Sequence, residues 1–536
     1  MRRWNSWGNE DSEYTTQLSD SLRDMLVALV GPSTPLPDAA LEDIIAIVPA
    51  SRLPAHPLVS VDAETRLRHA KGQSLPDWFA VRSGEFIAFP DGVAFPESAG
   101  DVSELLRYAA DNGISVIPYG GGTSVAGHIN PEPGERAVLT IDMGRMNELI
   151  HLDKDSQLAT FGAGTPGPLI EAQLQREGYT LGHYPQSWEL STIGGWVASR
   201  SSGQQSLRYG RIEQLFAGGS VETPVGRLEI PTIPASSAGP DIREMILGSE
   251  GRMGIITEVK VRVSALPEHE SFHVIFFPSW SEGMATAKQL VQLRIPLSMV
   301  RLSNQLETIS LLYMGSDSTT VEELETFLVS KGIGEEKVMM TLGVTGTTSQ
   351  CQASLEQTRE CCTQNLGVEV DGSLGERWAH GRFRAPYLRE PLGMAGYAVD
   401  TMETAIDWVR VTQTMADVEN ALRTALSDEG EQVHVYTHLS HVYGQGSSIY
   451  TTYLFRYAGC YEATLQRWQK LKAAGAQQIV AHGGTISHQH GVGADHSRYL
   501  EAEKGPLGIG AIRSLCQSFD PNGQMNPGKL LPRAVD

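Results

Sequence analysis

The spacing of hydrophobic residues predicts a strand, a helix and a second strand in the first third of the chain. An apolar run around Val93 is followed by apolar residues at i, i+3, i+4, i+7 and i+8 over residues 102–110, which is typical of an amphipathic helix. A capping-box sequence at residues 98–101 and Gly113 mark the two ends of that helix. A second apolar run at residues 114–117 completes the unit.

After residue 266 the pattern changes to that of a separate α+β unit. The expected order is strand, helix, strand, strand, helix, strand, as in ferredoxin-like folds, with one helix inserted. The expected strands are 271–277, 297–302, 337–342 and 368–370, and the expected helices are 282–293, 321–328 and 350–365. Beyond them we expect a long helix over 402–427, a strand pair at 433–439 and 449–457, and a helix over 462–474.

These patterns predict an α+β fold and divide the chain into four segments. Residues 1–85 form an irregular, partly helical N-terminal segment, and residues 86–267 form a ligand-binding domain. Residues 268–475 are expected to form a substrate-binding cap, and residues 476–536 to return to the ligand site.

Composition places the chain among globular proteins and narrows its partners. Of its 536 residues, 41% are hydrophobic and 20% are charged. The 42 Lys and Arg residues against 63 Asp and Glu residues give a formal net charge of −21. We therefore expect no nucleic-acid binding through a general positive field, and an anionic substrate needs a local basic pocket.

Cysteine usage favours a reducing compartment. The five cysteines lack C-x-x-C spacing and fit free thiols better than a disulfide framework, and the adjacent Cys361 and Cys362 fit packing within a helix. The sequence has no run of about 18 apolar residues and no evident secretory or peroxisomal signal. We expect a cytoplasmic protein.

The most informative stretch is the glycine loop, Pro118-Tyr119-Gly120-Gly121-Gly122-Thr123-Ser124. Three consecutive glycines after an apolar run leave backbone N–H groups uncovered by side chains, so a diphosphate can approach the main chain closely. A tight surface turn would use the same residues, and this loop alone does not decide between the two interpretations.

Further loops rich in glycine and hydroxyl side chains follow. Residues 162–167 match G-x-G-x-x-G by letter, but residues 181–185 lack the acidic residue that a nicotinamide site uses to bind ribose. We therefore expect a loop there that contacts a phosphate or a ring. With the loops at 186–203 and 248–256, the pattern predicts one long ligand lying across an α/β domain.

Several histidines are candidates for chemistry. Alternate residues of an extended strand face the same way, so His488 and His490 are expected to share a pocket. A metal site, a substrate site and a surface position are the competing interpretations. No metal is expected, because no Asp, Glu or Cys has suitable local spacing. His434, His438 and His441 fall at an expected strand, where polar packing is the preferred interpretation.

Together these motifs resemble the FAD-binding flavoproteins of the vanillyl-alcohol oxidase type. The glycine loop, W-E-L-S-T-I-G-G-W at 188–196, G-S-E-G-R-M-G-I-I-T-E at 248–258 and H-G-V-G at 490–493 carry that likeness. W-N-S-W-G at 4–8 and R-F-R-A-P-Y-L-R at 382–389 resemble more specifically the alkyldihydroxyacetonephosphate synthase family, essentially from end to end. The resemblance implies a PCMH-type FAD-binding domain with a ferredoxin-like α+β cap domain.

The resemblance also implies FAD, expected to be noncovalent, with His128 as the residue considered for a covalent link. The residues expected to bind the cofactor are Pro118, Tyr119, Gly120, Gly121, Gly122, Thr123, Ser124, Gln186, Ser187, Trp188, Glu189, Leu190, Ser191, Thr192, Ser199, Arg200, Ser201, Ser202, Glu250, Gly251, Arg252, Met253, Gly254, Ile255 and Ile256.

By the same resemblance, Tyr450 is the catalytic tyrosine that gives or takes a proton, with His488 and His490 beside it. A phenol suits that role only if neighbours shift its pKa from about 10. Arg389 matches the substrate-binding arginine and can hold a phosphate or carboxylate, and Arg301 is a second expected cation for the flavin or substrate.

The implied function is that of an FAD-dependent alkylglycerone-phosphate synthase in ether-lipid synthesis. Such an enzyme replaces the acyl group of acyl-dihydroxyacetone phosphate by a long-chain alcohol through a flavin N5 adduct, without net redox change.

The chain departs from the family pattern at two positions. Gln489 stands where the family has His, and Ala494 stands where the family has a Lys that could contact a phosphate. The alternative is an FAD-linked dehydrogenase or oxidase of a 2-hydroxy acid or alcohol. We expect lipid substrates, peripheral membrane contact and a homodimer.

Overall fold

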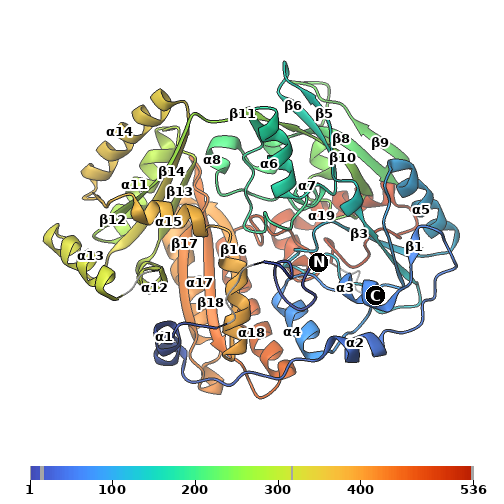
Figure 1. Cartoon of the computed structure of the whole chain (residues 1–536), viewed down its shortest axis with the longest axis horizontal. Helices are drawn as coiled ribbons and strands as arrows, with labels where there is room; N and C mark the ends of the chain where they lie inside the picture. Colours follow the sequence, from blue (N-terminus) through green and yellow to red (C-terminus); the bar gives the residue numbers. More distant parts are fainter. Residues whose placement is uncertain (1, 13–16, 316–317, 533–536) are drawn as a thin grey trace.

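The computed structural model describes residues 2–12, 17–315 and 318–532 (Figure 1). Its strands form three main sheets that follow one another along the chain. Across the described residues, no helix combines the length and apolar character needed to cross a bilayer. The last four residues, considered above for a peroxisomal signal, lie outside the described part.

The first sheet carries the glycine loop. Its strands run in the order β1 (Val59–Ser60), β2 (Gly92–Ala94), β4 (Val138–Asp142) and β3 (Ser115–Tyr119). Helix α5 (Ala99–Asp111) begins at the predicted capping box and connects β2 to β3. The predicted strand, helix, strand unit is confirmed, although β4 pairs in parallel between its two strands. The glycine loop therefore leaves the sheet at the carboxyl end of a strand, where open α/β sheets place ligands.

The second sheet is antiparallel and carries the other loops of this half. Its order is β5 (Leu149–Asp153), β6 (Leu158–Gly162), β10 (Ile255–Arg262), β8 (Phe216–Thr223) and β9 (Gly226–Ile230). Helices α6 (Gly167–Arg176), α7 (Ile193–Ser199) and α19 (Leu500–Phe519) contribute to its core. The sequence analysis missed α19, because Gly505 and Pro506 interrupt its pattern.

The third sheet is the largest and forms one wall of the cavity described below. Its order is β15 (Val368–Glu369), β12 (His269–Phe277), β14 (Val338–Gly346), β13 (Met299–Ser303), β17 (His434–Leu439), β18 (Gly446–Arg456) and β16 (Tyr397–Asp407). Helices α11 (Trp280–Gln292), α14 (Thr348–Gln364), α17 (Trp408–Thr424) and α18 (Tyr461–His482) pack against it. The predicted strand pair extends the sheet as β17 and β18. Cys361 and Cys362 are buried free thiols in α14, as expected.

The long helix predicted over 402–427 is wrong in its first part. Residues 397–407 form β16, which pairs with β18 along its whole length, and α17 begins only at Trp408. Pairing with a neighbouring strand decided this segment, since β-propensity depends on such packing more than on local preference. The difference matters because β16 carries residues of the cavity wall.

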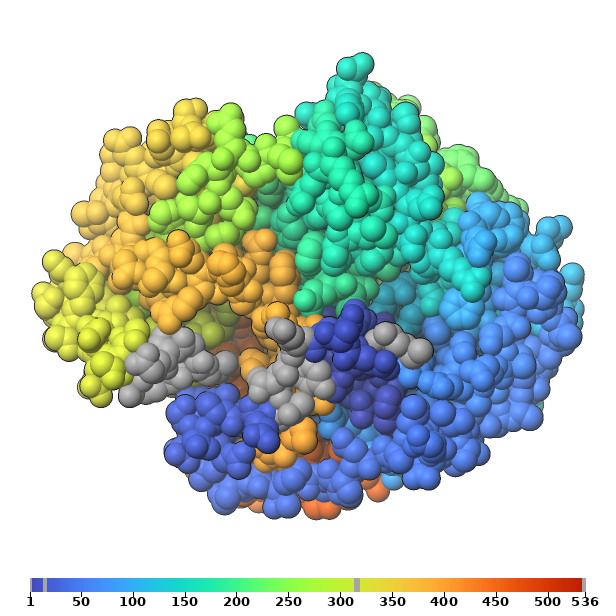
Figure 2. All heavy atoms as spheres, viewed as in Figure 1, coloured from blue at the N-terminus to red at the C-terminus, as the bar shows by residue number. Residues whose placement is uncertain are grey.

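The remaining elements connect or cover these sheets. They are α1 (Asp20–Val30), α2 (Leu41–Ile47), α3 (Ala63–Arg68), α4 (Leu75–Ser83), β7 (Tyr179–Thr180), α8 (Ser206–Tyr209), α9 (Ile212–Leu215), α10 (Arg243–Ile246), β11 (Ser264–Ala265), α12 (Gln305–Gly315), α13 (Ser318–Ser330), α15 (Ser373–Gly381) and α16 (Arg389–Met394). Figure 2 shows the dark blue N-terminal residues where the teal, gold and lighter blue surfaces meet. Arg3 anchors this segment through an ion pair of 2.5 Å with Glu390 of α16.

Candidate active site between the glycine loop and the third sheet

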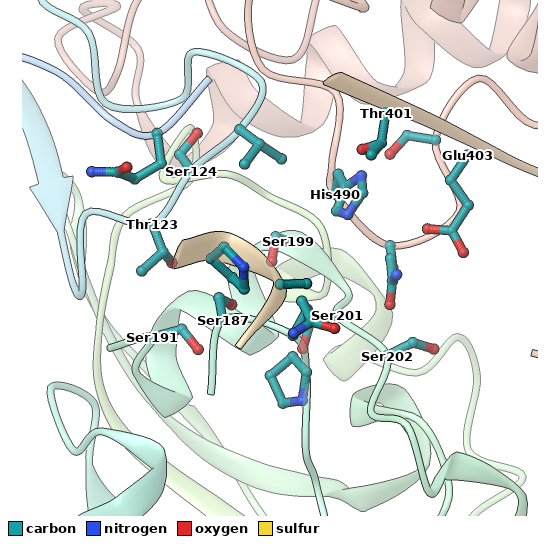
Figure 3. A pocket seen from close by; sticks show the side chains of 18 of the residues that line it. Thr123, Ser124, Ser187, Ser191, Ser199, Ser201, Ser202, Thr401, Glu403 and His490 are labelled. Carbon is teal, nitrogen blue, oxygen red and sulfur yellow. The ribbon is translucent and has the colours of Figure 1, made fainter. Parts of the chain in front are cut away.

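One cavity of about 530 Å³ lies between the three sheets. Its walls are the glycine loop, the loops around α7, one face of the third sheet and part of the N-terminal segment. Figure 3 shows hydroxyl side chains such as Ser187 and Ser199 in one part of this cavity, and Thr401, Glu403 and His490 in another. Cavities of this size commonly hold cofactors and small-molecule substrates.

Most residues expected to bind FAD line this cavity. They are Pro118, Tyr119, Gly120, Gly121, Gly122, Thr123, Ser124, Gln186, Ser187, Ser191, Thr192, Ser199, Ser201, Ser202, Glu250, Gly251, Gly254, Ile255 and Ile256. The expected residues that lie outside its described lining are Trp188, Glu189, Leu190, Arg200, Arg252 and Met253. Arg252 instead holds a neighbouring segment, because it donates to the carbonyl oxygens of Met525 and Asn526 at 2.8 and 3.0 Å.

The loop at 162–167 contributes less than expected. Within it, Ala163 is the residue that lines the cavity as described. A Cβ at Gly162 or Gly164 would collide with the backbone carbonyl oxygen of Met146 or Met143. These glycines are therefore explained by close backbone packing rather than by a ligand.

The glycine loop has no room for side chains and its carbonyl groups are engaged. A Cβ at Gly121 would collide with the carbonyl oxygen of Leu190, and Gly122 has a φ of +62°, which favours glycine. Arg2 donates hydrogen bonds to the carbonyl oxygens of Gly121 and Gly122, the second at 3.3 Å. The sequence pattern of the N-terminal segment did not predict this role for Arg2.

Unpartnered polar atoms show that this part of the cavity fits a polar ligand. Thr192 Oγ1, Gln204 Oε1, Ser487 Oγ and Asn526 Oδ1 are buried in cavity-lining residues and have no hydrogen-bond partner among the described residues. Such atoms are costly to bury, so a ligand rich in donors and acceptors would stabilise them. A flavin with its ribityl hydroxyls and diphosphate has that character.

His128, the residue considered for a covalent link, is hydrogen-bonded at Nδ1, whereas Nε2 has an acidic neighbour but no hydrogen-bond partner among the described residues. Ser124 Oγ lies 2.6 Å from Nδ1, and Glu250 Oε1 lies 3.2 Å from Nε2. Burial works to lower the pKa of His128, but the charge of Glu250 outweighs it and the pKa is raised. Glu250 also accepts the N–H groups of Val492 and Gly493 at 2.5 and 2.8 Å. These contacts tie the glycine loop to the H-G-V-G segment.

The opposite wall is a sheet face to which three adjacent strands contribute rows of residues. Glu403 of β16 lies opposite Tyr450 of β18, which lies opposite His438 of β17. Opposite residues of antiparallel strands share a face, and all three line the cavity. The next rows on this face are Thr401, Thr452 and Tyr436, and then Val399, Leu454 and His434.

The three histidines expected in polar packing are buried and make polar contacts, and they also belong to the cavity wall. His434, His438 and His441 all line the cavity. His434 and His438 alternate along β17 and therefore point to the cavity side together with Tyr436 between them. The predicted strand was right, but the sequence did not reveal which face was open to a ligand.

Tyr450, the expected catalytic tyrosine, is buried among polar and aromatic groups. Its hydroxyl donates to Thr401 Oγ1 at 3.2 Å, and its ring stacks on that of His438 with centroids 4.8 Å apart. The ring centroid of His490 lies 6.1 Å away. Burial raises the pKa of Tyr450 to about 12, and the charge of Glu403 acts in the same direction. Its side chain is therefore a neutral phenol at physiological pH.

The structure separates the two histidines that the sequence placed on one strand. The segment bends, and His490 lines the cavity whereas His488 lies behind Glu403. His488 Nδ1 is 3.0 Å from Glu403 Oε1, while Arg211 Nη1 and Tyr443 Oη are 2.7 and 2.6 Å from Nε2. Because a guanidinium only donates, Nε2 accepts and the proton resides on Nδ1. Burial lowers the pKa of His488 to about 4, so the ring is neutral.

The same hydrogen bonds argue against a metal ion at this point. Glu403, His441 and His488 offer three ligand atoms within 4.8 Å of one another. Metal binding through His488 Nδ1 would require that atom to be free of its proton. By donating to Nε2, Arg211 keeps the ring proton on Nδ1, and its own positive charge lies beside the three ligand atoms. The arrangement therefore suits a hydrogen-bond network better than a bound cation.

Two cations share one buried carboxylate at the edge of the cavity. Arg389 lies 3.7 Å from Asp400 and donates to the carbonyl oxygen of Gln73 at 2.6 Å. Lys472 of α18, which the sequence analysis missed, lies 3.5 Å from Asp400. All three charged residues line the cavity. Their net charge is positive, as an anionic headgroup requires.

Arg301, the second expected cation, is also paired. It donates to Glu307 Oε1 at 2.8 Å, and both residues line the cavity. The pKa of Glu307 is held at about 2 although burial opposes this, because His438 and Arg301 stabilise its charged form. Glu390, the residue next to Arg389, pairs with Arg3 rather than with Arg389.

One part of the cavity lining, which we call the apolar arm, consists of aliphatic side chains from α1, α12, α16 and the same sheet face. It is lined by Leu22, Met25 and Leu26 of α1, Leu311 of α12, Leu388 and Leu392 at α16, and Val399 and Leu454 of the sheet. Figure 1 shows α1 and α12 at one corner of the molecule, and the two helices contact each other. An alkyl chain would gain about 0.8 kcal/mol per methylene group buried there.

Comparison with known proteins identifies the chain's relatives. The model described as "FAD binding domain" matches residues 90–230, and the model described as "FAD linked oxidases, C-terminal domain" matches residues 266–530. The alkyldihydroxyacetonephosphate synthase of Trypanosoma brucei brucei is 31% identical over 486 residues, which cover 88% of this chain and 78% of the relative. The chain belongs to the alkyldihydroxyacetonephosphate synthase family. It is therefore an FAD-dependent enzyme.

Solved structures agree with this family. One alkyldihydroxyacetonephosphate synthase superposes with a TM-score of 0.84 at 26% identity and covers 100% of this chain and 99% of that chain. A p-cresol methylhydroxylase with substrate bound superposes with a TM-score of 0.65 at 12% identity, covering 92% of this chain and 97% of that chain. The second likeness concerns the fold alone. The two family models and the synthase structure confirm the expected α+β fold with an FAD-binding domain.

Proposed function

We propose that this chain is an alkylglycerone-phosphate synthase, which replaces the acyl group of an acyl ketone phosphate by a long-chain alcohol. The observation that carries the proposal is that the polar row around Tyr450 and the apolar arm toward α1 belong to one cavity. A small hydroxy acid would need no such arm, whereas a lipid substrate needs both a polar reaction centre and a channel for its chain.

The glycine loop and the loops around α7 would hold FAD in the half of the cavity opposite the third sheet. Backbone N–H groups near Gly121 suit the diphosphate, and the unpartnered Thr192 and Asn526 suit the polar parts of the cofactor. FAD, when bound, supplies the redox-active ring system that activates the substrate carbon. We propose that the cofactor is noncovalent, because Nδ1 of His128 is bound to Ser124 and Nε2 lies 3.2 Å from the carboxylate of Glu250, with which the ring forms an ion pair.

The headgroup of the substrate would bind beside Arg389 and Lys472. Their shared partner Asp400 fixes both side chains at the cavity edge. Arg389 has a planar guanidinium that can donate two parallel hydrogen bonds to a phosphate, and Lys472 adds a point charge. Lys472 thereby offers a cation in a chain that has Ala494 where the family has Lys.

Tyr450 and His490 would move protons at the reacting carbon. Tyr450 carries its proton at neutral pH because burial raises its pKa to about 12. Burial lowers the pKa of His490, so its ring is the better proton acceptor of the two. We assign His488 a positioning role, since it contacts Glu403 rather than the cavity.

The apolar arm would bind the alkyl chain, and we propose that the lipid enters the cavity near α1. The arm is bordered by α1, in which Val27 is 41% exposed. We propose that this corner contacts a membrane surface peripherally. Binding to phosphatidylcholine vesicles tests that contact, and Val27→Asp should bind the vesicles more weakly than wild type.

We also propose that the protein is a homodimer. Sedimentation velocity tests this, because a dimer should sediment with twice the mass of one chain.

Two assays decide between the proposed reaction and the alternative oxidoreductase. Purified FAD-loaded protein should incorporate labelled hexadecanol into an alkyl ketone phosphate while releasing fatty acid. Anaerobic incubation with lactate, glycolate or 2-hydroxyglutarate should leave the yellow flavin oxidised. Rapid bleaching of the flavin without alcohol incorporation would overturn the transferase and favour the dehydrogenase.

A further inference from the structure

Glu403 is a buried carboxylate whose two oxygens have different surroundings. Its side chain is 1% exposed, yet the residue lines the cavity. Oε1 lies 3.0 Å from His488 Nδ1 and 3.3 Å from Ser440 Oγ. Oε2 is buried and has no partner among the described residues. An unpartnered carboxylate oxygen in a cavity wall is an expensive feature unless a ligand meets it.

The groups behind Glu403 keep it ionised. Arg211 donates to His488 Nε2 and so directs the Nδ1 proton toward Oε1. A second histidine is nearby, since His441 Nδ1 lies 3.8 Å from Glu403 Oε1. Burial by itself would raise the pKa of Glu403, but these histidines hold it well below its ordinary value. The carboxylate is therefore negatively charged at physiological pH, and its buried Oε2 has no hydrogen-bond partner among the described residues.

The groups in front of Glu403 belong to the reaction centre. Tyr450 is its direct cross-strand neighbour, and side chains opposite each other in this way lie about 5 Å apart at Cβ. Figure 3 shows Glu403 and His490 in the same part of the cavity, with Thr401 beside them. A proton acceptor at Glu403 and a protonated phenol at Tyr450 are thus placed side by side.

We propose that Glu403 is a further catalytic residue, whose Oε2 accepts the hydroxyl proton of the incoming alcohol. This inference rests on the proposed function. As the O–H bond breaks, the alcohol oxygen uses that electron pair to form the ether bond to the substrate carbon. The bond from that carbon to the acyl oxygen breaks, and the fatty acid leaves as a carboxylate that keeps its electron pair. The proton then passes from Glu403 to solvent.

A comparison of two nucleophiles tests this role. An alcohol must lose a proton, whereas a labelled fatty-acid carboxylate that exchanges into the acyl substrate has none to lose. Glu403→Gln retains the size of the side chain and an oxygen for His488. It should lower hexadecanol incorporation by about 10²- to 10⁴-fold, the usual contribution of a general base, and leave palmitate exchange within about threefold of wild type.

Further variants separate this role from damage to the fold. Formate, added to Glu403→Ala, should restore part of the alcohol incorporation by replacing the missing carboxylate. Asp407→Asn removes an exposed carboxylate from the same strand and should behave as wild type. Equal loss of both reactions in Glu403→Gln, or unchanged alcohol incorporation, would overturn the inference. Absence of alcohol incorporation in wild type would instead overturn the proposed function.

Discussion

Arg2 donates a hydrogen bond to the carbonyl oxygen of Gly121, a residue 119 positions further along the chain. A second bond reaches the carbonyl oxygen of Gly122, and the Arg2 carbonyl itself accepts from Arg68 at 2.8 Å. Because Arg2 holds the carbonyl oxygens of Gly121 and Gly122, we expect the glycine loop to keep its conformation where it lines the cavity. We therefore expect the N-terminal residues to support the proposed cofactor site.

Removal of this contact should weaken FAD binding. Hydrogen bonds to charged groups contribute about 1.5–3 kcal/mol, so Arg2→Ala should raise the Kd for FAD by about 10- to 100-fold. The increase should appear as faster recovery of free flavin fluorescence on dilution. Arg23→Ala removes an exposed arginine of α1 and should have no such effect. An unchanged Kd in Arg2→Ala would mean that the loop holds its shape without the N-terminus.

Tyr450 and Tyr453 provide a matched pair on opposite faces of β18. Tyr450 faces the cavity, whereas Tyr453 is fully buried on the other side and donates to Asp400 at 3.1 Å. Tyr450→Phe should reduce alcohol incorporation by about 10²- to 10⁴-fold, since it removes a proton donor at the reaction centre. Tyr453→Phe should lower stability by about 1 kcal/mol. Because Tyr453 supports Asp400, which holds Arg389 and Lys472, this variant should also bind the ketone phosphate less tightly, but it should keep the rate of alcohol incorporation at saturating substrate.

The two variants are compared by the rate of alcohol incorporation and by urea unfolding. If Tyr453→Phe abolished activity while Tyr450→Phe kept it, the assignment of the catalytic tyrosine would be wrong. Both variants should retain FAD, because neither phenol belongs to the glycine loop or the loops around α7.

The loops of the cofactor half were predictable because their signal is local. The glycine loop at 118–124 directly follows a predicted strand, and residues 186–203 are rich in glycine and hydroxyl groups. Most of these glycines and hydroxyl residues line the cavity. The catalytic face was predictable only in part. It is assembled from β16, β17 and β18, and the sequence placed a helix where β16 lies. Glu403 was missed for that reason.

Contacts between distant segments carried no sequence signal. Lys472 lies on a predicted helix, but only the packing of α18 against β16 brings it to Asp400. Likewise, the residues around Arg2 in the sequence do not predict its hydrogen bonds to the carbonyl groups of the glycine loop. Family resemblance supplied Tyr450 and Arg389, whereas the groups that surround and charge them required the structure.

His488 predicts how stability depends on pH. Its pKa is about 4 in the folded protein and 6.5 ordinarily, because burial disfavours the charged ring. The unfolded chain therefore binds a proton more readily, and stability is lost as the pH falls from about 6.5 toward 4. The difference between the two pKa values of His488 corresponds to on the order of 3 kcal/mol in the free energy of unfolding. The melting temperature of wild type should thus fall more steeply between pH 7 and pH 4.5 than that of His488→Gln.

His380 gives the control for that measurement. It is an exposed histidine of α15, and His380→Gln should keep the wild-type dependence of the melting temperature on pH. If His488→Gln followed the same slope as wild type, the acid sensitivity would have to come from other buried groups. His434 is one such group, since burial lowers its pKa to about 4 as well.

The apolar arm predicts a chain-length preference that a single residue of α1 can change. Met25 lines the arm, whereas Val27, two residues further on the same helix, is exposed. Met25→Trp should fill part of the channel and exclude the end of a long chain. Loss of about two buried methylene groups costs about 1.6 kcal/mol, so the KM for hexadecanol should rise by about tenfold. The KM for decanol should change little, because a shorter chain ends before the obstruction. Val27→Trp should leave both constants unchanged, and a parallel rise for both alcohols in Met25→Trp would place the alkyl chain elsewhere.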